Sequence, residues 1–435
     1  MDLIKKIDTR SAKIGVIGLG YVGLPLAMEF ANANYQVMGI DIDQNKINSL
    51  NKGENYINDI DDEDLKSAVK KGLLKGTTDF SEVENLDALS ICVPTPLNKE
   101  KNPDISFIVS AMDEIKKYIH PNMIIILEST TYPGSTRELI LPYIKNDNLI
   151  IGENICLCFS PERIDPGNKE YNTSNTPKII GGLTPICSEI GKKLYSTIIN
   201  EVIIVSSPET AEMVKLLENT FRAINIGLAN EVAIMCEKLG INAWEVIDAA
   251  ATKPFGFMRF SPGPGLGGHC IPIDPYYLSW KLKTLDYDAR FIKLAGEINT
   301  QMPVHVIDLI ISGLNKNKKS LNGSKILIIG VAYKKDIEDC RESPALDIIE
   351  LLQKNGSNVK YYDPYVSNLS YNHINLKSLK TLDASTIKSF DANVIVTDHS
   401  SIDFNIISKN SNLVIDTRNV FPNIKSNNIL RLGQG

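Results

Sequence analysis

A short apolar run that leads into three glycines and then a helix-like segment strongly limits how the N-terminal part of this chain folds. The run is Lys13–Ile17, the glycines are Gly18, Gly20 and Gly23, and the segment that follows is Leu24–Ala31. The first glycine suits a tight turn, and the third lets a helix pack closely on a strand. The order strand, glycine turn and helix predicts the first unit of a parallel α/β sheet.

Further apolar runs continue this alternation. They are separated mostly by polar or helix-like stretches, and they lie at Tyr35–Ile40, Ala88–Val93, Met123–Leu127, Ile155–Phe159 and Val202–Val205. A second series starts at Lys325 and ends near Arg418, with Gly330 as the glycine at its first turn. Alternating β and α segments favour doubly wound parallel sheets, so we expect two Rossmann-like α/β domains.

A long helix is expected between the two series. Residues 208–240 contain no proline after Pro208 and close with Gly240, the pattern of one uninterrupted helix. We therefore expect an N-terminal Rossmann-like domain over 1–206, a helical domain over 207–312 and a second Rossmann-like domain over 313–435. The central helix is also where we expect a homodimer or larger homo-oligomer to form.

The glycine pattern has a specific chemical use. The second glycine lets backbone approach a pyrophosphate, and the start of the following helix favours negative charge. Asp41 ends the next apolar run, 18 residues beyond Gly23, where a carboxylate can bond a ribose hydroxyl. Because that carboxylate would repel a 2′-phosphate, NAD is favoured over NADP. The alternative is a helix-capping or solvated aspartate.

Composition excludes several classes of protein. A net charge of −6 over 435 residues gives no general attraction to nucleic acid. The first residues are mixed in charge and lack the apolar run of a signal peptide, so none is expected. No apolar stretch reaches the roughly 18 residues of a membrane span. Seven cysteines without a C-x-x-C pair indicate reduced cytoplasmic thiols and no metal site.

One of these cysteines has unusual surroundings. Cys270 lies within Phe260–Pro275, a stretch rich in glycine and proline that would hold a thiol in one accessible place. Such a loop suits a nucleophile. The alternative is a buried structural thiol, since cysteine is among the most buried residue types.

Several motifs in a fixed order resemble those of the nucleotide-sugar 6-dehydrogenases, the UDP-glucose/GDP-mannose dehydrogenase family. Beyond the glycine turn they are Val93-Pro-Thr-Pro, Glu128–Gly134, Ser160-Pro-Glu-Arg163, Lys215 with Asn219, Gly267-Gly-His-Cys270, Lys334-Lys-Asp336 and Arg341-Glu-Ser-Pro344. The resemblance covers nearly the whole chain. Ser160–Tyr171, Thr252–Gly256 and Gly267–Pro275 look most like the bacterial members that oxidise UDP-N-acetylglucosamine for surface polysaccharide such as O-antigen or capsule.

The resemblance implies an oxidation of C6 from alcohol to carboxylate in two NAD-dependent steps. Asp274 would accept a proton through water, and Cys270 would carry a thiohemiacetal and then a thioester. Lys215 and Asn219 would stabilise the oxyanion. Glu162 would assist thioester hydrolysis. The remaining implied catalytic residue is Thr130, which would help to hold the water.

The resemblance also implies two sets of binding residues, with the C-terminal domain taking the UDP part. The implied cofactor contacts are Gly18, Gly20, Tyr21, Val22, Gly23, Asp41, Lys46, Thr95, Thr130 and Arg341. The implied substrate contacts are Glu162, Arg163, Lys215, Asn219, Gly267 and Lys334. Some UDP-glucose enzymes have a second glutamate where this chain has Pro166, so the role of that carboxylate is not carried over, and Asp165 is the neighbouring acid in this chain. His269 is not assigned as the catalytic base.

Three alternatives remain open. The same machinery would serve UDP-N-acetylgalactosamine, UDP-glucose or GDP-mannose. An NAD-containing sugar epimerase would return its hydride, show no net NADH and have no need of Cys270. A non-catalytic NAD-binding scaffold would tolerate loss of Cys270 and Lys215.

Overall fold

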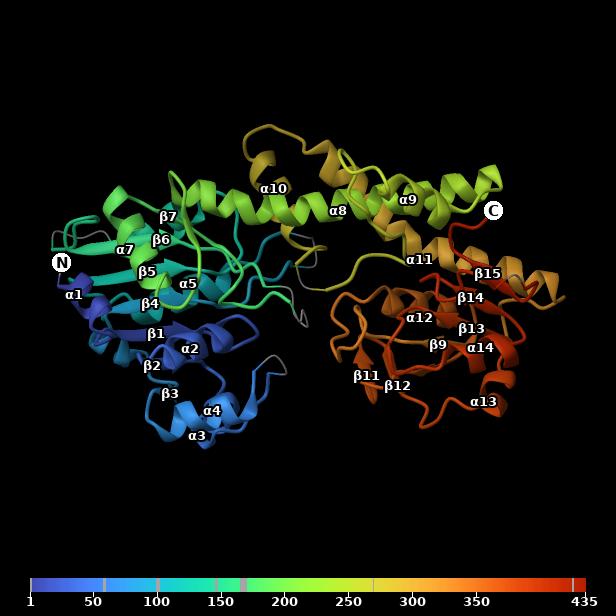
Figure 1. The fold of residues 1–435 in the computed structure, drawn as a ribbon, viewed down its shortest axis with the longest axis horizontal. Coiled ribbons are helices and arrows are strands. Elements are labelled where there is room, and N and C mark those ends of the chain that lie inside the picture. Colours follow the sequence, from blue (N-terminus) through green and yellow to red (C-terminus); the bar gives the residue numbers. More distant parts are fainter. Residues whose placement is uncertain are drawn as a thin grey trace. The chain divides into compact units, whose positions relative to one another are not determined.

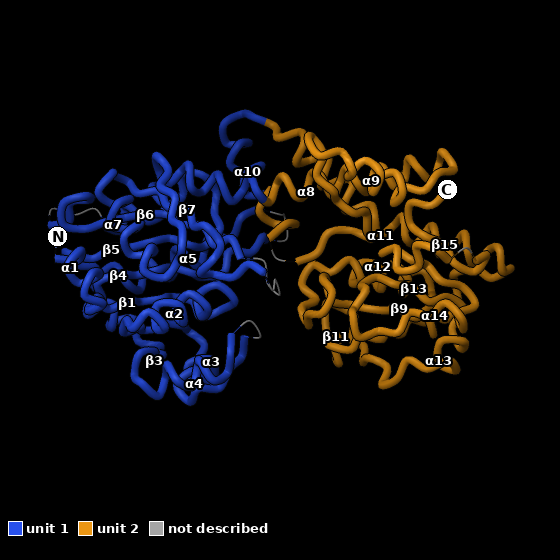
Figure 2. Tube along the Cα trace, in the orientation of Figure 1, with its two compact units in different colours: residues 1–218, 276–287 blue, residues 219–275, 288–435 orange. Residues whose placement is uncertain are grey.

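The computed structural model describes residues 2–57, 60–98, 102–144, 148–164, 170–268, 270–424 and 426–435. These residues form two compact units, coloured separately in Figure 2. Unit 1 comprises residues 1–218 and 276–287, and unit 2 comprises 219–275 and 288–435. Among the described residues, no helix combines the length and apolar character that crossing a bilayer requires.

Unit 1 is built on a sheet whose described strands run in the order β3-β2-β1-β4-β5-β6-β7-β8 (Figure 1). The strands are β1 (Lys13–Ile17), β2 (Gln36–Ile40), β3 (Leu74–Thr77), β4 (Ala88–Ile91), β5 (Met123–Leu127), β6 (Ile155–Phe159), β7 (Lys178–Gly182) and β8 (Val202–Ile204). The first six strands are parallel, and their order reverses between β1 and β4, as in dinucleotide-binding folds. This arrangement confirms the predicted Rossmann-like sheet.

One strand direction differs from the expected parallel pattern. β7 pairs with β6 in the antiparallel direction, and β8 is parallel to β7. Only a short ladder joins β6 and β7, with Cys158 opposite Gly182 and Phe159 opposite Gly181. The sequence does not reveal this reversal because a strand that is buried on both faces has the same apolar pattern in either direction.

Helices cover both faces of this sheet. They are α1 (Leu3–Asp8), α2 (Gly23–Asn32), α3 (Gln44–Lys52), α4 (Asp62–Lys70), η1 (Phe80–Asn85), α5 (Ser106–Ile115), η2 (Thr136–Ile140), α6 (Leu141–Ile144) and α7 (Pro185–Tyr195). Alternate residues of β5 point to opposite faces of the sheet and pack into two different hydrophobic cores. Ile124 and Ile126 join the core beneath α1, α2 and α7, whereas Ile125 and Leu127 join the core beneath α5 and α6.

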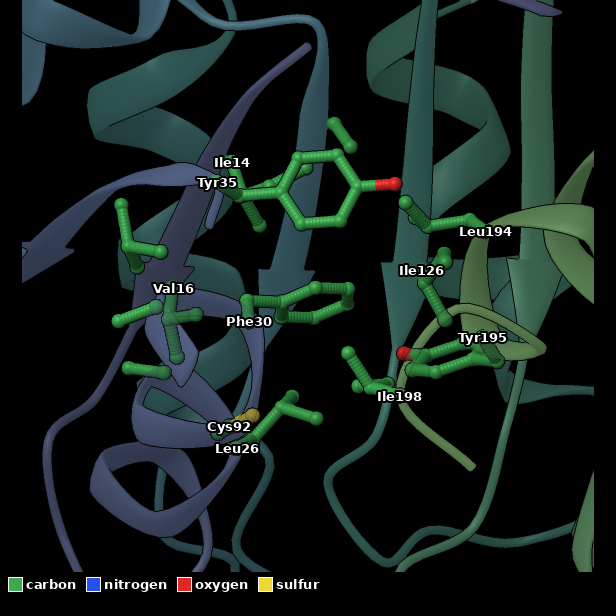
Figure 3. Close-up of a cluster of buried hydrophobic side chains, with 14 of the residues drawn as sticks. Ile14, Val16, Leu26, Phe30, Tyr35, Cys92, Ile126, Leu194, Tyr195 and Ile198 are labelled. Carbon is green, nitrogen blue, oxygen red and sulfur yellow. The ribbon is translucent and has the colours of Figure 1, made fainter. Parts of the chain in front are cut away.

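Three aromatic rings pack together within the first of these cores. Phe30 of α2 lies beside Tyr35 and Tyr195, with ring centroids 5.8 and 6.0 Å away (Figure 3). All three side chains are fully buried. Tyr195 at the end of α7 is therefore held on its apolar side by packing, and its hydroxyl is directed to a buried polar group described below.

The expected long helix is present as α8 (Pro208–Leu239), which begins in unit 1 and ends in unit 2. The described helices that come next are α9 (Ala243–Ala251), α10 (Asp274–Lys283) and α11 (Arg290–Lys316). Buried Asn230 of α8 and Asn299 of α11 are hydrogen-bonded over 2.9 Å, and Asn230 also accepts the N–H of Gly263. These amides anchor the glycine-rich loop to the helices.

Unit 2 contains a second parallel sheet, with described strands in the order β10-β9-β13-β14-β15. Its strands and those of a nearby antiparallel pair are β9 (Lys325–Ile329), β10 (Asn358–Tyr362), β11 (Asn368–Tyr371), β12 (Ile374–Lys377), β13 (Ala392–Ile395), β14 (Val414–Asp416) and β15 (Ile429–Arg431). The helices of this part are α12 (Pro344–Lys354), α13 (Ala384–Lys388) and α14 (Phe404–Asn410). A second α/β domain is thereby confirmed, whereas the exact three-domain boundaries stay a prediction.

Candidate active site

The glycine turn after β1 has the geometry that a pyrophosphate site needs. A Cβ on Gly23 would lie 1.8 Å from the Gly18 carbonyl oxygen, so only glycine permits this close packing of α2 on the turn. A Cβ on Gly20 would meet no atom within 4 Å, so backbone at this position is open to a ligand. The first turn of α2 contains no acidic residue, which leaves its N-terminus favourable to an anion. Tyr21 and Val22 complete the turn.

Asp41 lies directly after β2 and is almost fully buried against this turn. Its Oδ2 accepts the N–H of Leu19 at 2.8 Å and is 3.4 Å from Lys46 Nζ, while its Oδ1 accepts the N–H of Asp43 at 2.9 Å. A carboxylate has about four acceptor positions, so capacity remains for a ribose hydroxyl. The structure thus brings Asp41 and Lys46 to the glycine turn, and both fit an NAD site.

Three further predicted residues follow neighbouring strands at the same edge of the sheet. Thr95 comes after β4, Thr130 after β5 and Glu162 after β6. Ser129 Oγ donates to the carbonyl of Val93 at 2.8 Å and thereby ties the second of these loops to the first. The carboxyl ends of parallel strands are where α/β sheets bind ligands.

Glu162 is held by backbone on one oxygen and by a buried lysine on the other. Its Oε1 accepts the N–H groups of Arg163 at 2.7 Å and Ile164 at 3.0 Å, and its Oε2 lies 3.4 Å from Lys178 Nζ. Burial raises the pKa of Glu162, but Lys178, the Arg163 N–H and Lys215 together lower it below the usual 4.5. Glu162 is therefore ionised at neutral pH.

Lys178 opens β7 and also pairs with Glu128, which follows β5. Its Nζ is 2.8 Å from Glu128 Oε2, and the side chains of both residues are almost completely buried. Burial alone would lower the pKa of Lys178, yet Glu128 and Glu162 raise it above its ordinary value. Burial raises the pKa of Glu128, Lys178 opposes that rise, and Glu162 adds to it.

No role was predicted for Lys178 or Glu128 from the sequence. Glu128 begins one of the motifs named above, whereas Lys178 precedes an ordinary apolar run. Only the pairing of β7 with β6 brings Lys178 near Glu162. The sequence signal that could have indicated this site is a lysine at the start of a strand that is buried on both faces. A charge in that position needs an oppositely charged partner. A small cavity of about 10 Å³, room for roughly one water molecule, is lined in part by Glu162, Arg163 and Lys178.

Arg163, a predicted substrate contact, is paired within unit 1. Its guanidinium donates to both carboxylate oxygens of Glu218, at 3.2 and 2.6 Å, and to the carbonyl of Pro177 at 2.5 Å. A two-bond pair of this kind fixes the plane of the guanidinium.

Lys215 lies one turn before Asn219 on α8, and its side chain is buried.

In unit 2 the structure brings together Cys270, Asp274 and Asn219. Cys270 is exposed, whereas the thiols of Cys92, Cys156, Cys158, Cys187 and Cys236 are buried. The N–H of Asp274, the first residue of α10, donates to the Cys270 carbonyl at 2.8 Å. Asn219 Nδ2 donates to Asp274 Oδ2 at 2.6 Å. An accessible thiol thus lies one turn from a buried carboxylate that an amide holds in place.

The loop carrying Cys270 packs on the loop that carries Lys334 and Arg341. The N–H of Gly268 donates to the Arg341 carbonyl at 3.1 Å. Gly268 has φ +87°, and a Cβ there would lie 2.8 Å from the Tyr333 ring, so the contact requires glycine. Gly267 makes a similarly close approach, since its Cβ would lie 2.6 Å from Tyr333 Cβ.

The side chain of Arg341 is bonded to Asp339 through Nε and Nη2, at 2.6 to 3.0 Å. Lys334 is half-buried in the same loop. The roles predicted for both residues in binding cofactor or substrate stay predictions. His269 and Asp165 lie outside the described residues.

Asp363, at the end of β10, holds the turn after β9 much as Asp41 holds the turn after β1. Its Oδ2 accepts the N–H groups of Val331 at 2.7 Å and Ala332 at 3.2 Å. The same oxygen is 3.0 Å from Nε2 of His399, which is fully buried. Neither Asp363 nor His399 was predicted from the sequence to belong to a site.

Comparisons with known proteins agree with this geometry. A UDP-N-acetyl-D-mannosamine dehydrogenase of Methanococcus maripaludis is 37% identical over 423 residues, which cover 94% of this chain and 93% of the relative. A UDP-N-acetyl-D-glucosamine 6-dehydrogenase of Pseudomonas aeruginosa is 36% identical over 360 residues, covering 82% and 84%. The solved UDP-N-acetylmannosamine dehydrogenase of Pyrococcus horikoshii superposes with a TM-score of 0.88 at 33% identity, covering 97% of this chain and 99% of that one.

Three sequence models of one family match in succession. The NAD binding domain matches residues 12–199, the central domain matches 209–301 and the UDP binding domain matches 327–423. The cofactor is therefore NAD, and the fold, the glycine turn and the matched domains together show that the chain belongs to the UDP-glucose/GDP-mannose dehydrogenase family.

Proposed function

We propose that this protein oxidises C6 of UDP-N-acetyl-D-glucosamine to the carboxylate in two steps, giving UDP-N-acetyl-D-glucosaminuronate. The observation that supports this most directly is the arrangement of Cys270, Asp274 and Asn219. An exposed thiol one turn from an amide-bound carboxylate suits covalent catalysis on an aldehyde. A transient-redox epimerase needs no such thiol.

In the first step Asp274 would take the proton of the C6 hydroxyl through a water molecule. The bond from Asn219 holds Oδ2 of Asp274 and so orients the carboxylate. NAD, when bound, accepts a hydride from C6 in each of the two oxidations. Gly18–Gly23, Asp41 and Lys46 are the residues proposed to hold it, with Thr95 and Thr130 at the neighbouring strand ends.

In the second step the Cys270 thiolate would add to the C6 aldehyde to form a thiohemiacetal, which becomes a thioester on oxidation. Lys215 and the second N–H of the Asn219 amide are the proposed donors to the oxyanion. Such a donor contributes about 3 to 4 kcal/mol to transition-state stability. Glu162, which is ionised, would then accept the proton of the hydrolytic water that Thr130 helps to hold.

The identity of the sugar is the finer part of the proposal. The resemblance of Ser160–Tyr171 and Gly267–Pro275 favours the N-acetylglucosamine substrate, and the P. aeruginosa relative is named for it. UDP-N-acetyl-D-mannosamine is a second candidate because the M. maripaludis relative, at 37% identity, is named for that epimer. Both names specify a 2-acetamido sugar, so UDP-glucose and GDP-mannose rank lower. We place the reaction in cytoplasmic synthesis of surface polysaccharide precursors.

The test is the amount of NADH formed per sugar by purified protein. UDP-N-acetylglucosamine should give two NADH and an acid product, and Cys270→Ser should still bind NAD and sugar while forming no acid at a significant rate. One NADH or none from the wild-type protein would exclude the two-step reaction. A panel with UDP-N-acetylmannosamine, UDP-N-acetylgalactosamine, UDP-glucose and GDP-mannose identifies the preferred sugar by kcat/KM.

We also propose that α8 forms a homodimer interface. Within unit 2, α8 exposes apolar side chains at Phe221, Leu228, Met235 and Leu239, with spacings of 7, 7 and 4 that fall on one helix face. Leu228→Glu should convert the dimer to monomer in light-scattering measurements, whereas Lys238→Glu on the same helix should not. A wild-type monomer would exclude this interface.

A further inference from the structure

A buried lysine lies beside the carboxylate that the proposed function assigns to hydrolysis, and that function gives it no role. Lys178 is 3% exposed, and its Nζ lies 2.8 Å from Glu128 and 3.4 Å from Glu162. A buried charge is costly unless it is paired and hydrogen-bonded. One carboxylate would suffice to neutralise Lys178, so the second pairing calls for an explanation.

Glu128 is the fixed member of this cluster. Tyr195 donates its hydroxyl to Glu128 Oε1, and the Tyr195 ring is packed beside Phe30 in the core of unit 1 (Figure 3). Lys178 Nζ also lies 4.9 Å from the centre of the Tyr195 ring. Lys178 is therefore anchored from the core side, with its remaining N–H groups available to Glu162.

Glu162 depends on Lys178 because its other oxygen is already occupied. Oε1 accepts two backbone N–H groups, which leaves Oε2 as the oxygen that faces Lys178 and can act on water. Among the described residues, Lys215 also acts on Glu162 and favours its ionised form, whereas Glu128 disfavours that form. The buried thiol of Cys92 is close by, and burial raises its pKa so that it stays neutral.

We propose that Lys178 is a positioning residue for hydrolysis, which holds the Glu162 carboxylate ionised and directs its Oε2. The inference rests on the proposed function. In that step the water oxygen adds to the thioester carbonyl carbon and Glu162 takes the water proton. The C–S bond breaks, the Cys270 sulfur keeps the bonding electron pair, and the sugar leaves as the acid. A small cavity that is lined in part by Glu162 and Lys178 has room for about one water molecule.

The key variant is Lys178→Met, which keeps the length and apolar stem of the side chain and removes its charge. Its matched control is Lys193→Met, because Lys193 forms a surface ion pair with Asp8 at 2.7 Å on α7. Since Lys178→Met leaves Glu128 unpaired and can unfold, the double variant Lys178→Met with Glu128→Gln is made as well. The double variant keeps a hydrogen-bonding group at position 128 and leaves no carboxylate there.

Three measurements separate a positioning role from a structural one. When either Lys178 variant is mixed rapidly with UDP-N-acetylglucosamine and NAD, a burst of NADH from both oxidations should appear. Steady-state turnover after the burst should be about 10²-fold or more slower than in the wild-type protein. Intact-mass analysis should show the sugar acyl group accumulating on Cys270. The acid limb of the pH–kcat curve should move to higher pH in both Lys178 variants, since loss of Lys178 raises the pKa of Glu162.

The possible outcomes are distinguishable. Wild-type kcat and an unshifted acid limb in the folded double variant would overturn the inference, because Lys178 would then serve only to neutralise Glu128. A slowed first NADH without an accumulated acyl enzyme would overturn it too. If the wild-type protein itself yields fewer than two NADH per sugar, the proposed function fails, and that result is visible before any variant is compared. Lys193→Met should match the wild-type protein throughout.

Discussion

Asn219 donates its side-chain N–H to Asp274 over 2.6 Å and so joins residues 55 positions apart in the chain. This bond was not part of the sequence analysis, which assigned Asn219 to the oxyanion and Asp274 to proton transfer. Because an amide carries two N–H groups, the two assignments are compatible. The bond shows that Asn219 orients the carboxylate of Asp274.

Replacing Asn219 with alanine should therefore reduce kcat strongly with little loss of folding stability. The expected reduction is about 10²- to 10³-fold, the usual effect of removing one oxyanion donor. The control is Asn225→Ala on the same helix, where the amide only donates to the Phe221 carbonyl at 2.7 Å. Steady-state kinetics and thermal melts of both variants test this. An Asn219→Ala protein that keeps more than a tenth of kcat would contradict it.

The exposure of Cys270 predicts selective alkylation. With limiting iodoacetamide at pH 7, peptide mapping should find Cys270 modified first and activity lost in parallel. Cys340 is the internal comparison because it is only half-buried, yet burial, Asp363 and Asp339 raise its pKa from 9.0 to about 12. That rise reduces its thiolate fraction about 10³-fold. Equal labelling of the two thiols would refute the prediction.

The sequence predicted most of the fold because buried parallel strands are continuous apolar runs. β4, β5 and β6 begin at the first residues of the predicted runs. β3 and β7 were missed for local reasons. β3 reads Leu-Lys-Gly-Thr, and β7 begins with lysine and ends with two glycines, so neither resembles a strand by composition. The antiparallel direction of β7 depends on tertiary pairing.

The site shows a similar division. Residues within one local motif, such as Gly18–Gly23 or Cys270 with Asp274, could be predicted from spacing and resemblance. The pairs Lys178–Glu162 and Arg163–Glu218 were not found, because their members come together only through the pairing of β6 with β7 and the packing around α8. The spacing of residues in the sequence does not indicate which acidic side chain a buried lysine or arginine contacts.

The glycine turn predicts opposite results for two neighbouring glycines. Gly20→Ala should fold normally, because a Cβ there meets no atom within 4 Å, yet it should weaken NAD binding by placing a methyl group where backbone approaches pyrophosphate. We expect about a tenfold rise in Kd, which corresponds to roughly 1.4 kcal/mol. Isothermal titration with NAD and a thermal melt measure the two effects.

Gly23→Ala is the matched comparison. Its Cβ would lie 1.8 Å from the Gly18 carbonyl oxygen, so the backbone of the turn must move. This variant should lose folding stability as well as NAD binding. If Gly20→Ala melts as low as Gly23→Ala, the assignment of open space at Gly20 is wrong.

The Asp363 carboxylate should make the folding stability of the protein depend on pH. Burial raises the pKa of this carboxyl, but the hydrogen bond with His399 and the N–H groups of Val331 and Tyr365 outweigh burial and lower the pKa below 3.8. Since the folded pKa is below the unfolded one, the ionised group stabilises the fold above about pH 4. That contribution is lost as the pH falls through the folded pKa.

Asp363→Asn should therefore destabilise the protein by about 1 to 3 kcal/mol at pH 7, because one carboxylate oxygen becomes an amide that cannot accept from its N–H partners. The difference in Tm from the wild-type protein should shrink between pH 4 and pH 3. Asp403→Asn, at the N-cap of α14, is the control, because asparagine caps a helix as well as aspartate does. A difference in Tm that is the same at pH 7 and pH 3 would show that the charge of Asp363 does not stabilise the fold.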